Sequence, residues 1–446
     1  MGADVFSRIT KEKKPTLVKN GLDCPIMKIG ALLSLLLCSI LSAIPNSING
    51  GIVSNNSPLN GIDITEPLIA AVSGGPLPGE WETEGSVPGT RSAYLLAHPE
   101  VFGQKALLVR GLWREEELEE IQITFNDAGS YFGYFSETIP GDLKGRARDE
   151  LIKELFDEKQ ATFSELHAKS LALAKEQLAL RAEKKRPKEI RFGKSRTIRA
   201  EVLQYSWDGL VARLFHGPER LVRITLSKEG LQTSQWMDRE FSQLEGNEYK
   251  RLLQNRITKK ENGDQVLSDL SIVPQGYKPY CGLNTLVMAG RYLGLHIDED
   301  WLASAGKFQN TGSADGSQML SLYSSVAREA GISMKRLSNF NEILVKRSLR
   351  EGLPVIIWRR WSQERDRAHT EMSKNFARTG EGEWKPVDDS ALPDKNSPLH
   401  ASVIVGFNEA RNEFLILESW AHIQGPRRMP MHELAKTSYL TFCFQH

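Results

Sequence analysis

The chain is poor in cysteine, because its 446 residues contain only Cys24, Cys38, Cys281 and Cys443. Two of these lie in an N-terminal stretch that we expect to be removed. The two that remain cannot form a disulfide framework of the kind that holds small secreted domains together. No Cys-x-x-Cys pair or Cys/His cluster has the spacing of a zinc site. We therefore expect no metal and no cofactor.

The chain also lacks an excess of charge of either sign, since its net charge is +1. Nucleic acid binding needs a basic excess, and short basic runs such as Lys184–Arg186 are typical of a solvated helix end. We therefore expect no nucleic acid partner. The motifs G-x-S-x-G, Walker A and G-x-G-x-x-G are absent as well, so serine hydrolase and nucleotide-binding functions lack support.

The N-terminal residues 1–45 have the pattern of a leader. An apolar run from Ile29 to Ile44 follows a basic stretch, and the small residues Ser42 and Ala43 lie near its end. The run is shorter than the roughly 20 residues that span a membrane. This pattern is typical of a secretory signal, and a retained membrane anchor or a buried helix is the alternative. We expect an extracytoplasmic protein, secreted or periplasmic, with Met27 as a second candidate start.

Composition divides the rest of the chain into four parts. Residues 46–90 are rich in Gly, Pro, Ser and Asn, which predicts a flexible linker. Residues 91–245 predict a separate α+β domain with one long helix. Residues 246–264 are interpreted as a connector, and residues 265–446 as the last domain. The expected fold class is therefore α+β, in more than one domain.

The expected α+β domain alternates strands with one long helical segment. Alternating apolar residues over Glu120–Phe125 predict a half-buried strand. Asn126–Gly129 favours a hairpin turn into a further strand at Ser130–Phe135. Leucines at three- and four-residue spacing predict a helix from about 143 to 185. We find no catalytic constellation here, so this domain is interpreted as a scaffold or recognition unit.

The most informative stretch is Gln275–Gly282, which ends in Cys281-Gly282 and leads into an apolar run of helical spacing from Leu283 to Leu295. A thiol at a helix N-terminus feels the positive end of the helix dipole. That lowers the pKa of the thiol and favours the nucleophilic thiolate. Cys281 is therefore a candidate nucleophile, and the alternative is a plain buried cysteine.

A cysteine nucleophile needs a base, and His400 fits best among the nine histidines. It opens an apolar strand, and a second strand returns to end at Glu418. Two antiparallel strands joined in this way bring the start of one beside the end of the other. His400 and Glu418 would then form the base and its orienting carboxylate. A hydrogen-bonded histidine at a strand end, without catalytic role, is the alternative.

The order of these residues resembles papain-like cysteine peptidases, and more closely the C39-like group that trims double-glycine leaders. The match rests on Gln275 six residues before Cys281, on a later histidine that opens a strand, and on Ser419-Trp420. Cys-Gly-x-x-x-Leu-x-Met-x-x-x-Tyr-x-Gly, beginning at Cys281, is similar to that group's signature. Gly312–Gly331, Glu342–Arg350 and the following Gly-Leu-Pro-Val-Ile-Ile are similar to its next segments.

This resemblance covers residues 265–446 and implies a role for each matching residue. It implies that Gln275 is the oxyanion-hole glutamine, Cys281 the nucleophile and His400 the general base. Glu418 falls where the group usually has Asp or Asn, and it is one methylene longer. The implied fold is a helical part packed on an antiparallel sheet.

A long charged segment from Arg359 to Leu399 separates this helical part from the histidine strand. Loops of this length inside a domain are uncommon and are often lids or binding loops. We expect it to border the cleft, and a solvated insertion is the alternative.

Together these features predict an exported thiol hydrolase that cleaves a peptide or other amide bond in a peptide or protein substrate. One alternative is a non-catalytic binding or cell-surface module on the same fold. Another is a Cys-His acyltransferase. The oligomeric state and the cleavage specificity cannot be deduced from these motifs.

Overall fold

The computed structural model describes residues 57–133, 143, 145–217, 220–276, 278–308, 316–385, 387–420 and 425–446, with the backbone alone at 316–318. It also describes the backbone of two short strands, β1 (Ser47–Ile48) and β2 (Gly51–Ile52). The predicted leader, residues 1–45, lies outside the described residues. Within the described part of the chain, no helix is both long enough and apolar enough to cross a membrane.

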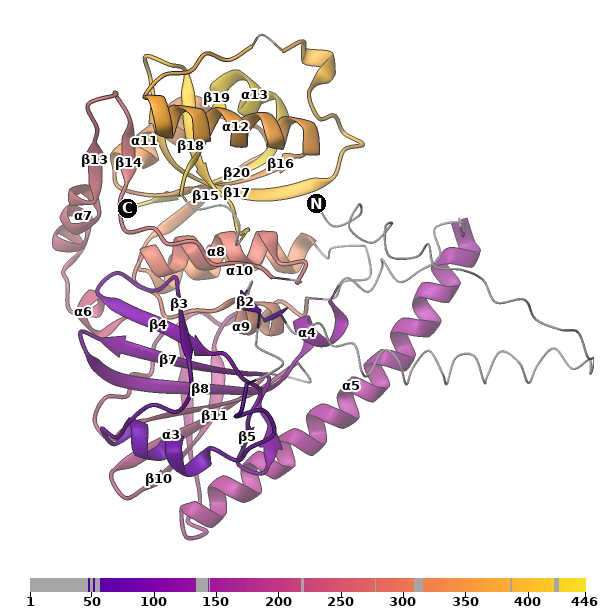
Figure 1. The fold of residues 1–446 in the computed structure, drawn as a ribbon, viewed down its shortest axis with the longest axis vertical. Helices are drawn as coiled ribbons and strands as arrows, with labels where there is room; N and C mark the ends of the chain where they lie inside the picture. Colours follow the sequence, from indigo (N-terminus) through magenta and orange to yellow (C-terminus); the bar gives the residue numbers. More distant parts are fainter. Residues whose placement is uncertain are drawn as a thin grey trace, which may run out of the picture.

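The chain is an α+β protein built around two large antiparallel sheets (Figure 1). The first is ordered β3-β4-β7-β8-β12-β11-β10-β9. Its strands are β3 (Trp81–Glu84), β4 (Thr90–Leu95), β7 (Leu108–Arg114), β8 (Glu117–Asp127), β9 (Lys188–Phe192), β10 (Ala200–Trp207), β11 (Leu210–Gly217) and β12 (Leu221–Lys228). A two-stranded ribbon of β5 (Glu100–Val101) and β6 (Gln104–Lys105) comes between β4 and β7 in the sequence.

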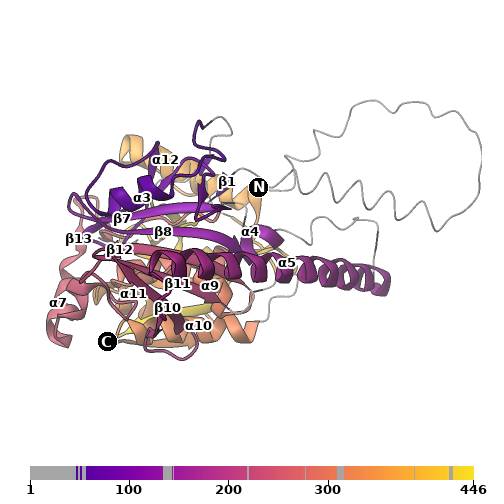
Figure 2. The same cartoon turned by 90° about the horizontal axis from the view of Figure 1, so that it is seen from below.

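Two helices cover one face of this first sheet. The short α3 (Thr65–Val72) contributes Leu68 and Val72, and the long α5 (Gly145–Arg181) contributes Leu178, to an apolar cluster. The alternating side chains of β8 complete that cluster, as their period predicts. Figure 2 shows α5 running along the sheet and extending beyond it. The predicted long helix is thus confirmed, with slightly shorter bounds.

Two local expectations for this region do not hold. Residues 57–90, part of the stretch 46–90 that we assigned to a flexible linker, contain α3, whose buried apolar residues pack on the sheet, and the edge strand β3. The segment after Phe125 is no hairpin, because β8 runs on to Asp127 and the helix α4 (Ala128–Phe132) follows. The Asp127 carboxylate accepts from the N–H of Gly129 and Ser130, so it caps a helix instead of making a turn.

The second sheet is ordered β13-β14-β17-β16-β20-β15, with β18 paired to β17 and β19 to β18. Its strands are β13 (Ile257–Lys259), β14 (Gln265–Leu267), β15 (Ser333–Leu337), β16 (Val355–Arg360), β17 (Leu399–Asn408), β18 (Glu413–Leu417), β19 (Arg427–Pro430) and β20 (Ser438–Gln445). The helices of this half are α6 (Arg239–Ser242), α7 (Gly246–Asn255), α8 (Cys281–Tyr292), α9 (Glu299–Ala305), α10 (Gly316–Glu329), α11 (Glu342–Arg350), α12 (Gln363–Thr379) and α13 (Met431–Thr437).

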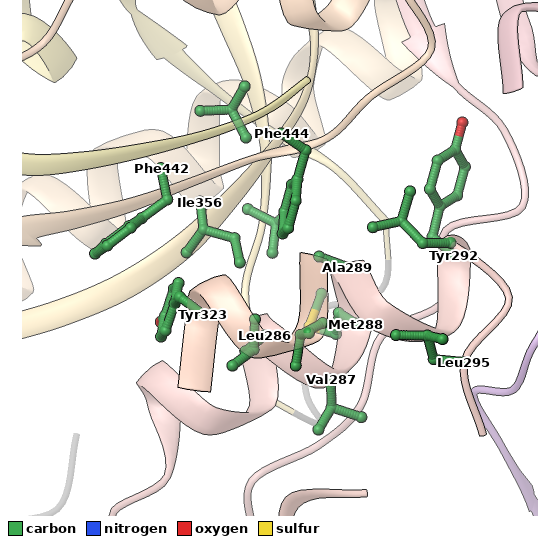
Figure 3. Packing of buried hydrophobic residues seen from close by; sticks show 14 of the residues in the cluster. Leu286, Val287, Met288, Ala289, Tyr292, Leu295, Tyr323, Ile356, Phe442 and Phe444 are labelled. Carbon is green, nitrogen blue, oxygen red and sulfur yellow. The ribbon is translucent and has the colours of Figure 1, made fainter. Parts of the chain in front are cut away.

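The helices α8, α9 and α10 lie between the two sheets (Figure 1). All ten residues from Leu283 to Tyr292 in α8 are buried, since the helix has a protein partner on every side. Figure 3 shows Ile356, Phe442 and Phe444 of the second sheet facing this helix. The same cluster continues to Phe215 of the first sheet. A helical part packed on an antiparallel sheet is the arrangement that the resemblance implied.

Two further segments differ from their expected form. The connector and the last domain were divided at residue 264, but β13 and β14 form one hairpin across that point, and β14 pairs with β17. The segment 359–399 is no structureless loop, because α12 occupies most of its first half and packs against β19. Ser362 caps α12, and Gly380 ends it in the left-handed conformation.

Candidate active site

Cys281 is the first residue of α8 and is partly exposed, whereas Cys443 is buried in β20. Burial would raise the pKa of the Cys281 thiol, but hydrogen bonds with His400 and with backbone N–H groups, together with the positive charge of His400, lower it below its ordinary value. Burial raises the pKa of Cys443 to about 11. Of these two thiols, Cys281 therefore has the lower pKa and the greater exposure.

His400 stands at the start of β17, and it contacts Glu418 and Cys281. Its Nε2 lies 2.7 Å from Oε2 of Glu418, which leaves Nδ1 for the hydrogen bond with Cys281. Burial would lower the pKa of His400, yet the charge of Glu418 and the contact with Cys281 raise it to about 9. The imidazole of His400 is therefore held in its charged form. Its positive charge in turn lowers the pKa of the Cys281 thiol.

The His400 ring is also covered on one face. Trp420 stacks on it with ring centroids 4.4 Å apart and an angle of 20° between the planes. Trp361, from the segment before α12, meets Trp420 edge-on at 6.1 Å. This pair shields the bond between His400 and Glu418 from water on that side, which strengthens it.

Glu418 is fully buried and accepts four hydrogen bonds. Besides His400, Ser402 donates at 2.8 Å, Nη2 of Arg359 at 2.8 Å and Nη2 of Arg427 at 2.7 Å. Burial would raise the pKa of the carboxyl, but the charges of His400, Arg359 and Arg427 hold it well below its usual range. The longer side chain of Glu418 is thus accommodated by two arginines, and the carboxylate stays ionised.

The expected pairing of strands explains how His400 and Glu418 meet. In the β17–β18 hairpin Val403 pairs with Leu417, so the residue after β18 reaches the beginning of β17. Cys281 comes to the same place because α8 packs directly against β17. The structure therefore brings together Cys281, His400 and Glu418, as their sequence pattern predicts.

Gln275, which lies six residues before Cys281, is held by two hydrogen bonds with Ser419. Its backbone N–H donates to the Ser419 carbonyl at 2.8 Å, and the Ser419 hydroxyl donates to Oε1 of Gln275 at 2.7 Å. Its Nε2 donates to the Lys278 carbonyl at 3.3 Å. Because the Ser419 hydroxyl donates to the amide oxygen of Gln275, the Nε2 group of Gln275 is turned towards Lys278.

The aromatic side chains of Tyr323 and Trp358 form an aromatic wall against the first turn of α8. Tyr323 donates to the Gly282 carbonyl at 2.7 Å, and Nε1 of Trp358 donates to the Tyr323 hydroxyl at 2.9 Å. A Cβ on Gly282 would lie 3.1 Å from Cε of Met319, so this position packs closely. The wall places apolar side chains beside the thiol.

Two residues of this site were not expected from the sequence, namely Arg359 and Arg427. Arg359 lies in β16 and is buried despite its charge, and Arg427 opens β19. The available signal for Arg359 was its place directly after the apolar run Val355–Trp358, because a charge is buried beside such a run only with a partner. The partner, Glu418, lies too far along the chain for any local pattern to name it.

A cavity of about 690 Å³ lies apart from the thiol, between β3, the β13–β14 hairpin and the segment that precedes Gln275. Cys281, His400 and Glu418 are not among its lining residues. In the described part of the chain, no group of three or more His, Cys, Asp or Glu side chains could hold a metal ion.

Comparisons with known proteins add little to this geometry. No family model matches the chain, and no curated protein matches it. A solved structure of a candidate C39-like peptidase from Bacillus anthracis is similar at 14% sequence identity, covering 41% of this chain and 96% of that chain, with a TM-score of 0.28. At this TM-score the chemistry has to be argued from the side chains themselves.

Proposed function

We propose that the chain is an exported cysteine hydrolase that cleaves a peptide or other amide bond. The observation that carries this proposal is the continuous line of contacts from Cys281 through His400 to Glu418. A nucleophile, a base and an orienting carboxylate in hydrogen-bond sequence are what acyl transfer by a thiol requires. The order of motifs from Gln275 to Trp420 supports assigning the last domain to the C39-like peptidases.

The proposed reaction starts from the thiolate–imidazolium pair of Cys281 and His400. Sγ of Cys281 forms a bond to the carbonyl carbon, and His400 gives its proton to the leaving amine as the C–N bond breaks. His400 then takes a proton from water, whose oxygen attacks the thioester and releases the acid and the thiolate. Glu418 stabilises the imidazolium in each step.

The oxyanion of the tetrahedral intermediate needs donors beside Cys281. The backbone N–H of Cys281, at the N-terminus of α8, is one candidate, and Nε2 of Gln275 is the other. Each such donor contributes about 3–4 kcal/mol to transition-state stabilisation in known enzymes. The hydrogen bond from Ser419 supports this role for Gln275, since it turns the amide nitrogen towards the loop that leads to Cys281.

The substrate class and the export route are parts of the same proposal. A peptide or protein substrate fits the partly exposed thiol and its aromatic wall. The basic and apolar leader pattern of residues 1–45 supports export, either by a cleaved signal or by a retained anchor. No nucleic acid partner and no cofactor enter the proposed reaction.

A non-catalytic module on this fold and an acyltransferase are the competing functions. The lowered pKa of Cys281 and the raised pKa of His400 favour a reactive pair over a merely structural one. An acyltransferase would use an amine in place of water in the second step. Adding an amine acceptor separates the two, because a transferase would form a new amide.

The experiment that tests the proposal is a digest of a defined peptide mixture followed by mass spectrometry. We expect cleavage by the wild-type chain and by Cys443→Ala, and none by Cys281→Ala. Cleavage that survives Cys281→Ala would overturn the assignment of the nucleophile. A wild-type chain that neither cleaves nor transfers any peptide in the mixture would favour the binding module.

A further inference from the structure

The loop that carries Gln275 and ends at the proposed nucleophile is held by a carboxylate of its own half of the chain and by one of the first sheet. Nζ of Lys278 lies 3.3 Å from Oδ2 of Asp127 and 2.6 Å from Oδ1 of Asp300. Asp127 ends β8 of the first sheet, and Asp300 lies in α9. All three side chains are buried. A buried ion pair constrains geometry strongly, because loss of one partner leaves a charge uncompensated.

A second contact joins the same two parts of the molecule. Gly129, in α4, lies against Tyr280, the residue directly before Cys281. A Cβ added to Gly129 would lie 1.8 Å from the Tyr280 hydroxyl oxygen, so α4 approaches this loop as closely as only glycine permits. Asp127 also caps α4. One carboxylate therefore fixes both the helix that contacts Tyr280 and the ammonium of Lys278.

Lys278 passes this constraint on to Gln275. Its carbonyl accepts from Nε2 of Gln275 at 3.3 Å and from the N–H of Tyr280 at 2.8 Å. Its own N–H donates to the Gln275 carbonyl at 3.1 Å. Because the Lys278 ammonium is held between Asp127 and Asp300, the position of the Lys278 carbonyl that orients the Gln275 amide depends on both carboxylates.

We propose that Asp127 and Lys278 are positioning residues, through which the first sheet sets the oxyanion-binding loop 275–281. This inference rests on the proposed function and gives the N-terminal domain a role in it. The domain is a platform for the catalytic loop and does not itself touch the reacting atoms. Another buried ion pair at this interface, Arg223 with Asp298, is linked to the loop only through Asp300, whose N–H donates to Oδ1 of Asp298 at 3.1 Å, an acceptor that asparagine keeps.

Two reagents that react at the same sulfur separate positioning from thiol reactivity. Iodoacetamide is attacked at a saturated carbon and releases iodide, so no oxyanion forms. With p-nitrophenyl acetate, Sγ of Cys281 bonds to the acetyl carbon, the carbonyl oxygen becomes an oxyanion, and p-nitrophenolate leaves as the thioester forms. The ratio of the acetylation rate constant to the alkylation rate constant therefore reports the oxyanion step alone.

The test variant is Asp127→Asn, and its matched control is Asp298→Asn. Both substitutions remove one carboxylate charge from a buried ion pair across the interface. Both keep an oxygen that can cap the helix that follows, α4 or α9. We expect Asp127→Asn to lower the rate ratio about tenfold or more, in line with the loss of an oriented oxyanion donor. Asp298→Asn should lower the melting temperature and leave the ratio unchanged.

A second variant, Gly129→Ala, reaches the loop without changing any charge. It adds one methyl group against Tyr280 and favours the helical conformation of α4. The same fall in the rate ratio is expected, and this variant decides the question alone if Asp127→Asn does not fold. The inference is overturned if the folded variants keep the wild-type ratio. The proposed function fails on a different result, namely if Cys281 of the wild-type chain is not acetylated at all.

Discussion

Nη2 of Arg427 donates to Oε1 of Glu418 over 2.7 Å, while Nη1 of the same arginine donates to Oδ1 of Asp366 over 2.6 Å. Asp366 belongs to α12, the helix inside the segment that we expected to be a loop. Arg427 therefore connects the carboxylate that contacts His400 to α12. The helix α12 supports the site mainly through buried charges, and its buried apolar side chain, Phe376, lies against the guanidinium of Arg428.

Replacing Arg427 should reduce activity as well as stability. Arg427→Met leaves a buried carboxylate with one fewer cation, which costs about 3–5 kcal/mol of folding free energy when a buried pair is broken. We expect kcat to fall at least about tenfold, because a misplaced base loses part of its 10²–10⁴-fold contribution. Arg428→Met is the control, since Arg428 is equally buried but binds Glu413 and Asp264. Equal kcat for both variants would contradict this role.

Removing the charge of Glu418 should change the pH profile. Burial alone would lower the pKa of His400, and the Glu418 charge raises it to about 9. In Glu418→Ala the pKa should therefore fall, the imidazolium should be lost at lower pH, and the alkaline limb of activity should move to lower pH. Glu418→Gln should be milder, because the amide oxygen can still accept from Nε2 of His400. An unmoved alkaline limb in the alanine variant would argue against the orienting role.

Iodoacetamide should label Cys281 before Cys443 in the folded protein. The lowered pKa of Cys281 means that the thiolate persists below pH about 8.5, the ordinary thiol value. Its labelling rate should therefore fall only at a pH below that value. Cys443, buried and with a pKa raised to about 11, should react only after unfolding. Peptide mapping after labelling distinguishes them, and earlier modification of Cys443 would count against the nucleophile assignment.

Ser419 should act only through Gln275. Ser419→Ala removes the hydroxyl that holds Oε1 of Gln275, so the amide can rotate and the oxyanion loses an oriented donor. We expect the acetylation rate with p-nitrophenyl acetate to fall severalfold while alkylation by iodoacetamide is unchanged. In a Gln275→Ala background the same substitution should have no further effect on acetylation. An additive loss in the double variant would show that Ser419 acts by another route.

Local patterns in the sequence were enough to predict that Cys281, His400 and Glu418 lie together. Cys281 was found because a thiol directly before an apolar run of helical spacing stands at a helix N-terminus. His400 and Glu418 were found together because a hairpin places the start of one strand beside the end of the next. Each of these inferences depends only on neighbours along the chain or on one short turn.

What the tertiary structure decided was the set of charges around those groups. The segment 359–399 has no apolar period, and α12 is held there by ion pairs such as Arg365 with Glu433, which only the folded chain brings together. Asp127 fits a hairpin turn as well as a helix cap, since Asp is favoured in both. Its partner Lys278 lies 151 residues further along the chain, and contacts between such distant residues leave no periodic trace in the sequence. The sequence by itself therefore determined which residues we propose to react, and the packing of the two sheets determined what holds them in place.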